Sequence, residues 1–117
     1  NITVKVIRDG SEADIPLCDV VMHDIVLLHP GDTVPADGIV MYGSLGCDES
    51  PLTGESAKVK KSFSHAVLQK YKSSHDEFKP ETGESSCVLR GSHVAEGSAA
   101  ILVTDVRLYR GGIIGRK

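Results

Sequence analysis

The chain has 117 residues, of which 40% are hydrophobic and 25% charged, and its formal net charge is −3. These values are typical of a single globular domain, and they give no reason to expect nucleic acid or an anionic membrane surface as a partner. Aromatic residues make up only 4% and tryptophan is absent, so we expect a core built mainly from Val, Ile, Leu and Ala.

Short strands dominate the prediction for the first part of the chain. Residues 2–8 (ITVKVIR) alternate between apolar and polar, which is the period of a half-buried strand. The Asp-Gly pair at 9–10 predicts a turn, and residues 13–15 a short return strand. Residues 20–28 are rich in β-branched side chains and predict a further strand.

Turn residues and strands continue to alternate further along. Residues 30–38 (PGDTVPADG) contain two prolines and two Asp-Gly or Gly-Asp pairs, and residues 39–42 predict the next strand. Three more strands are predicted at 87–89, 93–95 and 99–106. Many short strands with Gly and Pro between them predict an all-β domain, a sandwich or distorted barrel. From Arg107 onward we expect a final turn or the start of a helix.

Residues 64–86 differ from the rest of the chain. Ser, Lys, Glu and His dominate there without a strand period, although residues 66–72 could form two helical turns. Connections longer than about 12–15 residues are uncommon in compact domains, so this segment is either a functional lid or a disordered insertion. Its composition favours a flexible insertion within a single domain that spans residues 1–117.

The cysteines and histidines show no metal or disulfide pattern. Cys18, Cys47 and Cys87 are widely spaced, which indicates free thiols in a reducing compartment. The five histidines lack the i, i+4 pairing of a metal site. No apolar run approaches about 18 residues, the length that spans a membrane. The chain begins without Met, and we interpret it as a piece of a longer protein.

The four letters TGES occur twice, at residues 53–56 and 82–85. A carboxylate that orients water for hydrolysis must be held firmly, and a glycine beside it allows a substrate to approach the backbone closely. Glu55 follows a strand-rich region with Pro51 before it, whereas Glu84 follows the polar insertion. Because a catalytic group on a flexible tether spends little time in productive geometry, the first copy is the better candidate. A plain surface turn is the alternative for either copy.

Three stretches together resemble one family. Residues 30–38 (PGDTVPADG), 48–56 (DESPLTGES) and 91–98 (GSHVAEGS) resemble, in order and spacing, the motifs of the actuator domain of P-type ATPases, the ion pumps that form an aspartyl-phosphate. The resemblance implies a distorted jelly-roll, similar to a double-stranded β-helix sandwich, with residues 64–86 as a long polar insert loop. It places the first TGES in the family's loop and makes the second a coincidence of composition.

The resemblance also implies roles for the four residues of the first motif. Glu55 would position the water that attacks the aspartyl-phosphate of another domain, and Gly54 would let the phosphoryl group approach. Thr53 and Ser56 would hold the loop. The fragment alone would bind no cofactor and have no activity, while the parent pump would use ATP and Mg²⁺.

The kind of pump is less closely defined. The pattern TGES-x-x-VKK, with Lys58, Lys60 and Lys61, resembles plasma-membrane-type calcium pumps of the calmodulin-regulated branch, as does the segment at residues 111–114. Ca²⁺ is therefore the expected ion, and a proton or heavy-metal pump is the alternative. The expected partners are the phosphorylation and nucleotide-binding domains of the same chain. The fragment is expected to be a monomeric cytosolic domain of a protein in the plasma membrane, the vacuole or another organelle membrane.

Other charged residues have structural interpretations. Asp32 and Asp37 are expected to cap backbone N–H groups in tight turns, and Asp48 and Glu49 to fix the TGES loop. The lysines after the loop are either a solvated edge or a docking contact for a neighbouring domain or acidic lipid. Two other functions stay open from the residues alone: a β-domain that binds a partner through the insertion, and a free-standing hydrolase with Glu55 as general base.

Overall fold

The computed structural model describes residues 2–106, which form mainly antiparallel β-structure. The strands are β1 (Thr3–Arg8), β2 (Ser11–Pro16), β3 (Ile25–Leu28), β4 (Asp37–Asp48), β5 (Lys58–Ser62), β6 (Cys87–Val88) and β7 (His93–Asp105). The helices are α1 (Ser50–Thr53) and α2 (His65–Ser73), with 3-10 turns at Leu17–Asp19 and His75–Glu77. The predicted mainly β class is confirmed. The turn or helix predicted from Arg107, and residues 111–114, lie outside the described residues.

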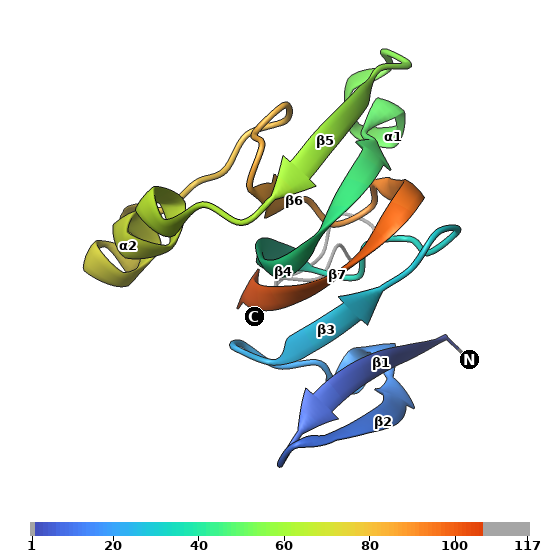
Figure 1. The fold of residues 1–117 in the computed structure, drawn as a ribbon, viewed down its shortest axis with the longest axis vertical. Coiled ribbons are helices and arrows are strands. Elements are labelled where there is room, and N and C mark those ends of the chain that lie inside the picture. Colours follow the sequence, from blue (N-terminus) through green and yellow to red (C-terminus); the bar gives the residue numbers. More distant parts are fainter. Residues whose placement is uncertain (1, 107–117) are drawn as a thin grey trace.

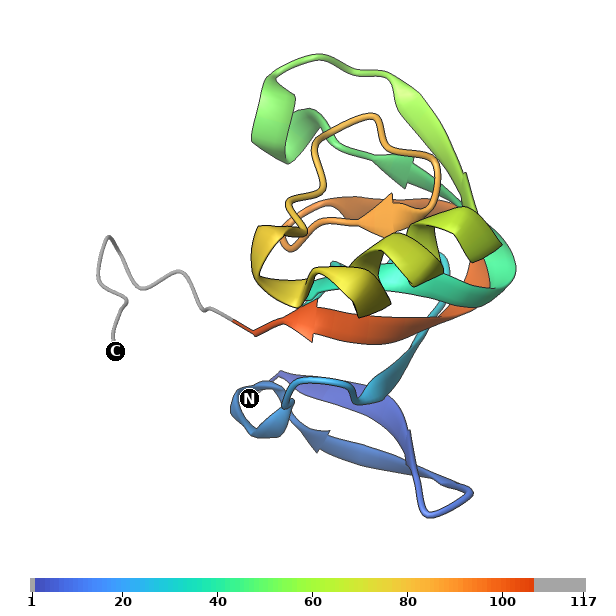
Figure 2. The same ribbon diagram turned by 90° about the vertical axis from the view of Figure 1, so that its left-hand side faces the viewer.

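The seven strands form one sheet in the order β2-β1-β3-β7-β4-β5, with β6 paired to β4. All of these pairs are antiparallel. The long β4–β7 pair has register shifts at three places, and such irregularities bend a sheet. Figures 1 and 2 show the β1–β2 hairpin at one end of the long axis and α1, with the connection to β5, at the other.

Two strands are longer in the structure than the sequence predicts. The predicted strands at 93–95 and 99–106 belong to β7, which passes through Gly97 at a φ of 83°. The predicted strand at 39–42 lies in the first half of β4, which continues through Gly43, also at a φ of 83°. These glycines bend the strands, while the β4–β7 pairing continues on both sides of them.

The prediction of a strand over residues 20–28 is wrong in its first half. The N–H of Val21 donates to the Asp24 carboxylate at 2.9 Å, and the N–H of Asp24 donates to the Val21 carbonyl at 3.1 Å. His23 has a φ of 72°, in the left-handed region. This tight turn excludes extended backbone, so β3 begins only at Ile25.

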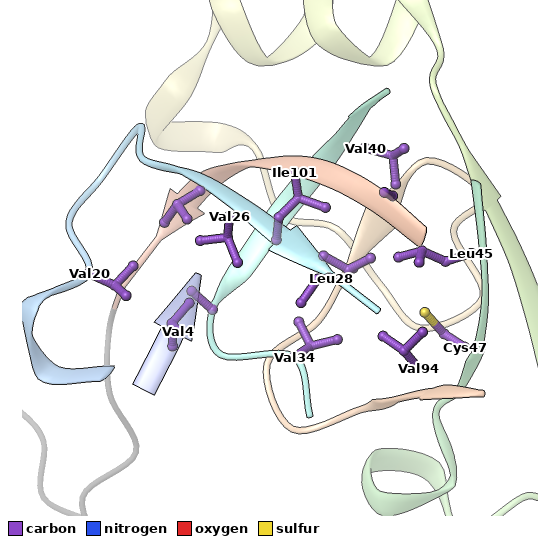
Figure 3. Close-up of a cluster of buried hydrophobic side chains, with 14 of the residues drawn as sticks. Val4, Val20, Val26, Leu28, Val34, Val40, Leu45, Cys47, Val94 and Ile101 are labelled. Carbon is purple, nitrogen blue, oxygen red and sulfur yellow. The ribbon is translucent and has the colours of Figure 1, made fainter. Parts of the chain in front are cut away.

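The main hydrophobic core lies on the inner side of the curved sheet (Figure 3). It consists largely of valines, with Leu28, Leu45 and Ile101 from three different strands. A second cluster lies under α2, where Leu68 and Tyr71 pack with Ile39 and Cys87. Aliphatic side chains thus supply the first core, as the composition predicts.

The cysteines are free thiols in the structure. Cys18 is exposed, whereas Cys47 and Cys87 are buried. Burial raises the pKa of the Cys87 thiol to about 11, so this thiol is protonated at neutral pH. Its place in the cluster under α2 gives Cys87 a packing role.

The insertion contains the helix α2, close to the two turns predicted at residues 66–72. The Ser64 hydroxyl caps it by accepting the N–H of Val67 at 3.2 Å. Tyr71 is stacked on His75 with ring centroids 4.5 Å apart, and its hydroxyl lies 2.8 Å from His23 Nε2. Figure 2 shows α2 in front of β4 and β7, running roughly alongside them. The flexibility of residues 64–86 as a whole stays a prediction.

We expect the Arg8–Asp24 pair to make stability depend on pH. Asp24 is buried and accepts two hydrogen bonds from Arg8, at 3.0 and 2.7 Å, and these contacts hold the pKa of its carboxyl below the usual value. A carboxylate with a lowered folded-state pKa contributes stability above its unfolded pKa of about 3.9 and loses it as the pH falls through the folded pKa. Asp24→Asn should therefore cost about 1–3 kcal/mol at pH 7 and progressively less below pH 4.

Thermal unfolding of the chain between about pH 7 and pH 2 would measure this difference. Asp14→Asn is the control, because Asp14 forms an exposed pair with Lys5, and it should change stability little at any pH. An Asp24→Asn deficit that stays constant down to the lowest pH would contradict the prediction.

Candidate functional site

The first TGES motif lies where β4 ends and the chain reverses into β5. Asp48, the last residue of β4, accepts the N–H of Ser50 at 2.9 Å. This bond is the main reason that the pKa of the Asp48 carboxyl is lowered. The carboxylate therefore remains an anion and holds the start of the turn. Asp48 therefore has the structural contact that we predicted for it.

A single helical turn, α1, leads into the motif. Pro51 lies in its first positions, where a missing N–H costs nothing. The Glu49 carbonyl accepts the N–H groups of Leu52, at 2.8 Å, and Thr53, at 3.1 Å. The helix ends at Gly54, whose φ of 79° is left-handed and favours glycine.

Glu55 follows this cap with its backbone held on both sides. Its N–H donates to the Thr53 hydroxyl at 3.0 Å, and its carbonyl accepts the N–H of Ala57 at 2.9 Å. Its side chain is exposed and has no ion-pair or hydrogen-bond partner among residues 2–106. The loop therefore presents a carboxylate to the surroundings on a fixed backbone.

The remaining residues of the motif differ in what they contact. A Cβ placed on Gly54 would meet no atom within 4 Å, so the space above this residue is open. The Thr53 hydroxyl bridges the turn, as described above. The Ser56 side chain forms no hydrogen bond with the described part of the chain, so a role in holding the loop has no contact to support it there.

A buried ion pair lies beneath the loop. Lys61 is fully buried and donates to Glu49 at 2.7 Å, and the other oxygen of Glu49 accepts the N–H of Gly83 at 2.7 Å. Lys61 also donates to the carbonyl of Glu84. The second TGES is thus placed against the base of the first, and its contribution comes from its backbone.

These contacts correct the interpretation of the lysines. Lys58 and Lys60 are exposed, as expected of a solvated edge, but Lys61 is not. The reason is β5, a strand that the sequence analysis did not predict: its Val59 and Lys61 share the face that points inward. The alternation of inward-facing and outward-facing residues in this segment could have predicted β5. It was missed because one of the inward-facing residues is a lysine.

The chain is similar to known proteins over most of its length. The model of the P-type ATPase actuator domain matches residues 1–109. The chain belongs to this family. Calcium-transporting ATPase 10, plasma membrane-type, of Arabidopsis thaliana is 36% identical over 107 residues, which cover 91% of this chain and 8% of that protein. Plasma membrane calcium-transporting ATPase 1 of Homo sapiens is 40% identical over 102 residues, covering 86% and 7%.

The actuator fold is also found in a solved structure. The crystal structure of a zinc-transporting PIB-type ATPase in the E2.Pi state matches 96% of this chain and 14% of its own, with a TM-score of 0.64 and 20% identity. That likeness shows the fold alone. The chain spans less than a tenth of the length of the two calcium-transporting relatives, so it corresponds to one module of such proteins.

Two acidic residues of the actuator motif at residues 30–38 have structural roles. The Asp32 carboxylate accepts the N–H of His29 at 2.8 Å, which is the local cap that we predicted. Asp37 accepts the N–H of Arg90 at 2.9 Å. The partner of Asp37 therefore belongs to a distant turn and not to the tight local turn that we predicted, and this contact joins the first motif to the residue just before the third.

Three further observations concern the described residues of the actuator domain. Within residues 2–106, no group of three or more His, Cys, Asp or Glu is arranged to hold a metal ion. No helix within these residues is long and apolar enough to cross a bilayer. A cavity of about 550 Å³ lies between β1 and the turn after β3, and its lining includes no residue of the TGES loop.

Proposed function

We propose that this actuator domain belongs to a calcium-transporting P-type pump, in which Glu55 positions water for hydrolysis of the aspartyl-phosphate. The observation that carries the proposal is the loop geometry: an exposed carboxylate on a backbone fixed from both sides. Calcium is favoured because relatives at 36–40% identity are named as calcium-transporting ATPases. The phosphate belongs to the phosphorylation domain of the same protein.

The chemistry needs the features that the loop provides. A general base must lie within hydrogen-bond reach of the water from which it takes a proton. The bonds to Thr53 and Ala57 restrict the backbone of Glu55, which lowers the entropy lost when the carboxylate reaches that water. Open space above Gly54 leaves room for a phosphoryl group at the backbone.

The negative charge of Glu55 is a physical reason for placing it on a domain that moves as a whole. A carboxylate is repelled by phosphate, so a productive pose is tolerable only while the domains are docked. In this proposal ATP, Mg²⁺ and Ca²⁺ bind to other parts of the parent protein, and Mg²⁺ neutralises charge on the transferred group. The domain faces the cytosol, and the plasma membrane is the favoured location because the relatives' names specify it.

The ion is tested with the parent pump in sealed vesicles. We expect ATP-driven uptake of radioactive calcium and phosphoenzyme formation from ATP that requires Ca²⁺. Protons and Zn²⁺ are tested in parallel, because pumps for those ions share this domain. Phosphoenzyme formation that requires Zn²⁺, or proton uptake without Ca²⁺, would contradict the calcium assignment and leave the role of Glu55 intact.

A further inference from the structure

The pair Glu49–Lys61 differs from every other ion pair of the described residues in its burial. The side chains are 4% and 0% exposed, whereas the pair Lys58–Glu96, which starts from the same strand, is 54% and 64% exposed. Burying two charges is costly unless each has further hydrogen bonds. Both oxygens of Glu49 are occupied and Lys61 has two acceptors, so the pair has a defined geometry.

This pair holds the second TGES turn, residues 82–85, against the domain. Glu49 accepts the N–H of Gly83, and Lys61 donates to the Glu84 carbonyl. A third contact is the N–H of Ser62, which donates to the Ser85 carbonyl at 2.8 Å. All three contacts use the backbone of the turn, and the Glu84 side chain is left exposed.

Glu49 also binds the start of the loop that carries Glu55. Its carbonyl accepts the N–H groups of Leu52 and Thr53, and the Thr53 hydroxyl accepts the N–H of Glu55. Hydrogen bonds therefore connect the second TGES turn to the side chain of Glu49, the carbonyl of Glu49 to Thr53, and the hydroxyl of Thr53 to the backbone of Glu55. We refer to this series of contacts as a path. A displacement of Glu49 would displace the start of this path.

We propose that Glu49 and Lys61 are positioning residues for Glu55, and that the second TGES turn is the part of the insertion that completes their site. The inference rests on the proposed function. Release of the turn leaves two buried charges with fewer partners, so Glu49 moves and Glu55 leaves its productive position. Hydrolysis of the aspartyl-phosphate then slows, while transfer of phosphate from ATP, which does not use this loop, continues.

The first test measures phosphoenzyme formation and decay in the full-length pump. Lys61→Met should slow decay about tenfold or more, with formation unchanged within about twofold. Lys58→Met is the matched control, since it removes a lysine of the exposed pair from the same strand, and decay should remain within about twofold of wild type. The double change Glu49→Gln with Lys61→Met leaves no unpaired buried charge, so it should fold even if the single change does not, and it should decay slowly.

The second test acts on the turn alone. Gly83 is exposed, with a φ of 88° and no atom within 4 Å of an added Cβ. Gly83→Pro removes the N–H that Glu49 accepts and cannot adopt this φ, so it should slow decay. Gly83→Ala keeps the N–H and should slow decay much less. Because these changes lie at the surface, they test the proposal even if the buried variants do not fold.

The third test separates positioning from general structural damage. If Lys61 acts through Glu55, adding Lys61→Met to Glu55→Gln should slow decay no further than Glu55→Gln alone. Multiplicative slowing in that background, or wild-type decay in both Gly83→Pro and the double variant, would overturn this inference. Unchanged decay after Glu55→Gln would overturn the proposed function instead, so the two failures are distinguishable.

Discussion

Glu55→Gln in the parent pump should slow decay of the phosphoenzyme by roughly 10²-fold or more, which is the usual contribution of a positioned general base. Glutamine keeps the size of the side chain but cannot take the proton from water. The bonds to Thr53 and Ala57 use the backbone of residue 55, so the loop should keep its shape. Stability should change by less than about 0.5 kcal/mol, as is usual for an exposed position.

The measurement is a chase experiment on pump that has been phosphorylated with radioactive ATP. Formation of the phosphoenzyme should be normal, since phosphate transfer from ATP does not use this carboxylate. Glu84→Gln is the matched control, because it makes the same substitution at the same position of the second TGES copy. Glu84 contributes only its carbonyl to Lys61, so this variant should decay within about twofold of wild type. Slow decay in Glu84→Gln with normal decay in Glu55→Gln would show that the wrong copy was chosen.

The sequence predicted that Asp48 fixes the loop, and local residue preferences explain the short helix before Glu55, which was not predicted. Asp48 and Pro51 are turn and helix-start residues, and Gly54 takes the left-handed cap that glycine favours. These preferences act over a few neighbours, so they can be read directly from the letters. The polar insertion before Glu84 favoured Glu55 as the better of the two copies, and the order of the family's motifs agreed with that choice; the role of Glu55 stays a prediction.

The base of the site could not be predicted from the sequence in the same way. We expected Glu49 to fix the TGES loop and Lys61 to lie at a solvated edge or docking contact. Their burial as a pair was not predicted, because it depends on Gly83, which lies 34 residues beyond Glu49 and returns to the same place. The second TGES looked like a coincidence because it lies in the insertion, outside the family's motifs, but its backbone contacts Lys61 and Glu49 in the structure. Contacts of backbone groups across such separations leave no pattern in side-chain type.

The strand boundaries show the same division between local and distant effects. Glycines normally weaken a strand, so we expected one strand to end before Gly43 and two separate strands on either side of Gly97. Each instead lies at the crossing of β4 and β7, where the partner backbone is too close for a side chain. Only the pairing of two strands that are distant in sequence shows this need.

Gly97→Ala should therefore be among the most destabilising single changes in the domain. A Cβ at residue 97 would lie 2.3 Å from the carbonyl oxygen of Ser44, and the φ of 83° is unfavourable for alanine. Left-handed backbone costs alanine about 1–2 kcal/mol, and moving a packed backbone a further 1–3 kcal/mol, so we expect a loss of about 2–5 kcal/mol. Urea unfolding of the chain would measure it.

Gly10→Ala separates the two contributions to this loss. Gly10 has nearly the same φ, 78°, but no atom lies within 4 Å of an added Cβ, so only the backbone cost of about 1–2 kcal/mol should appear. Equal losses in the two variants would mean that the close approach of β4 and β7 contributes nothing. A larger loss at Gly97 would show that β4 and β7 approach too closely at this point to accept a side chain. The pairing of these two strands continues to Asp48 and His93, and so it supports the strand end from which the Glu55 loop starts.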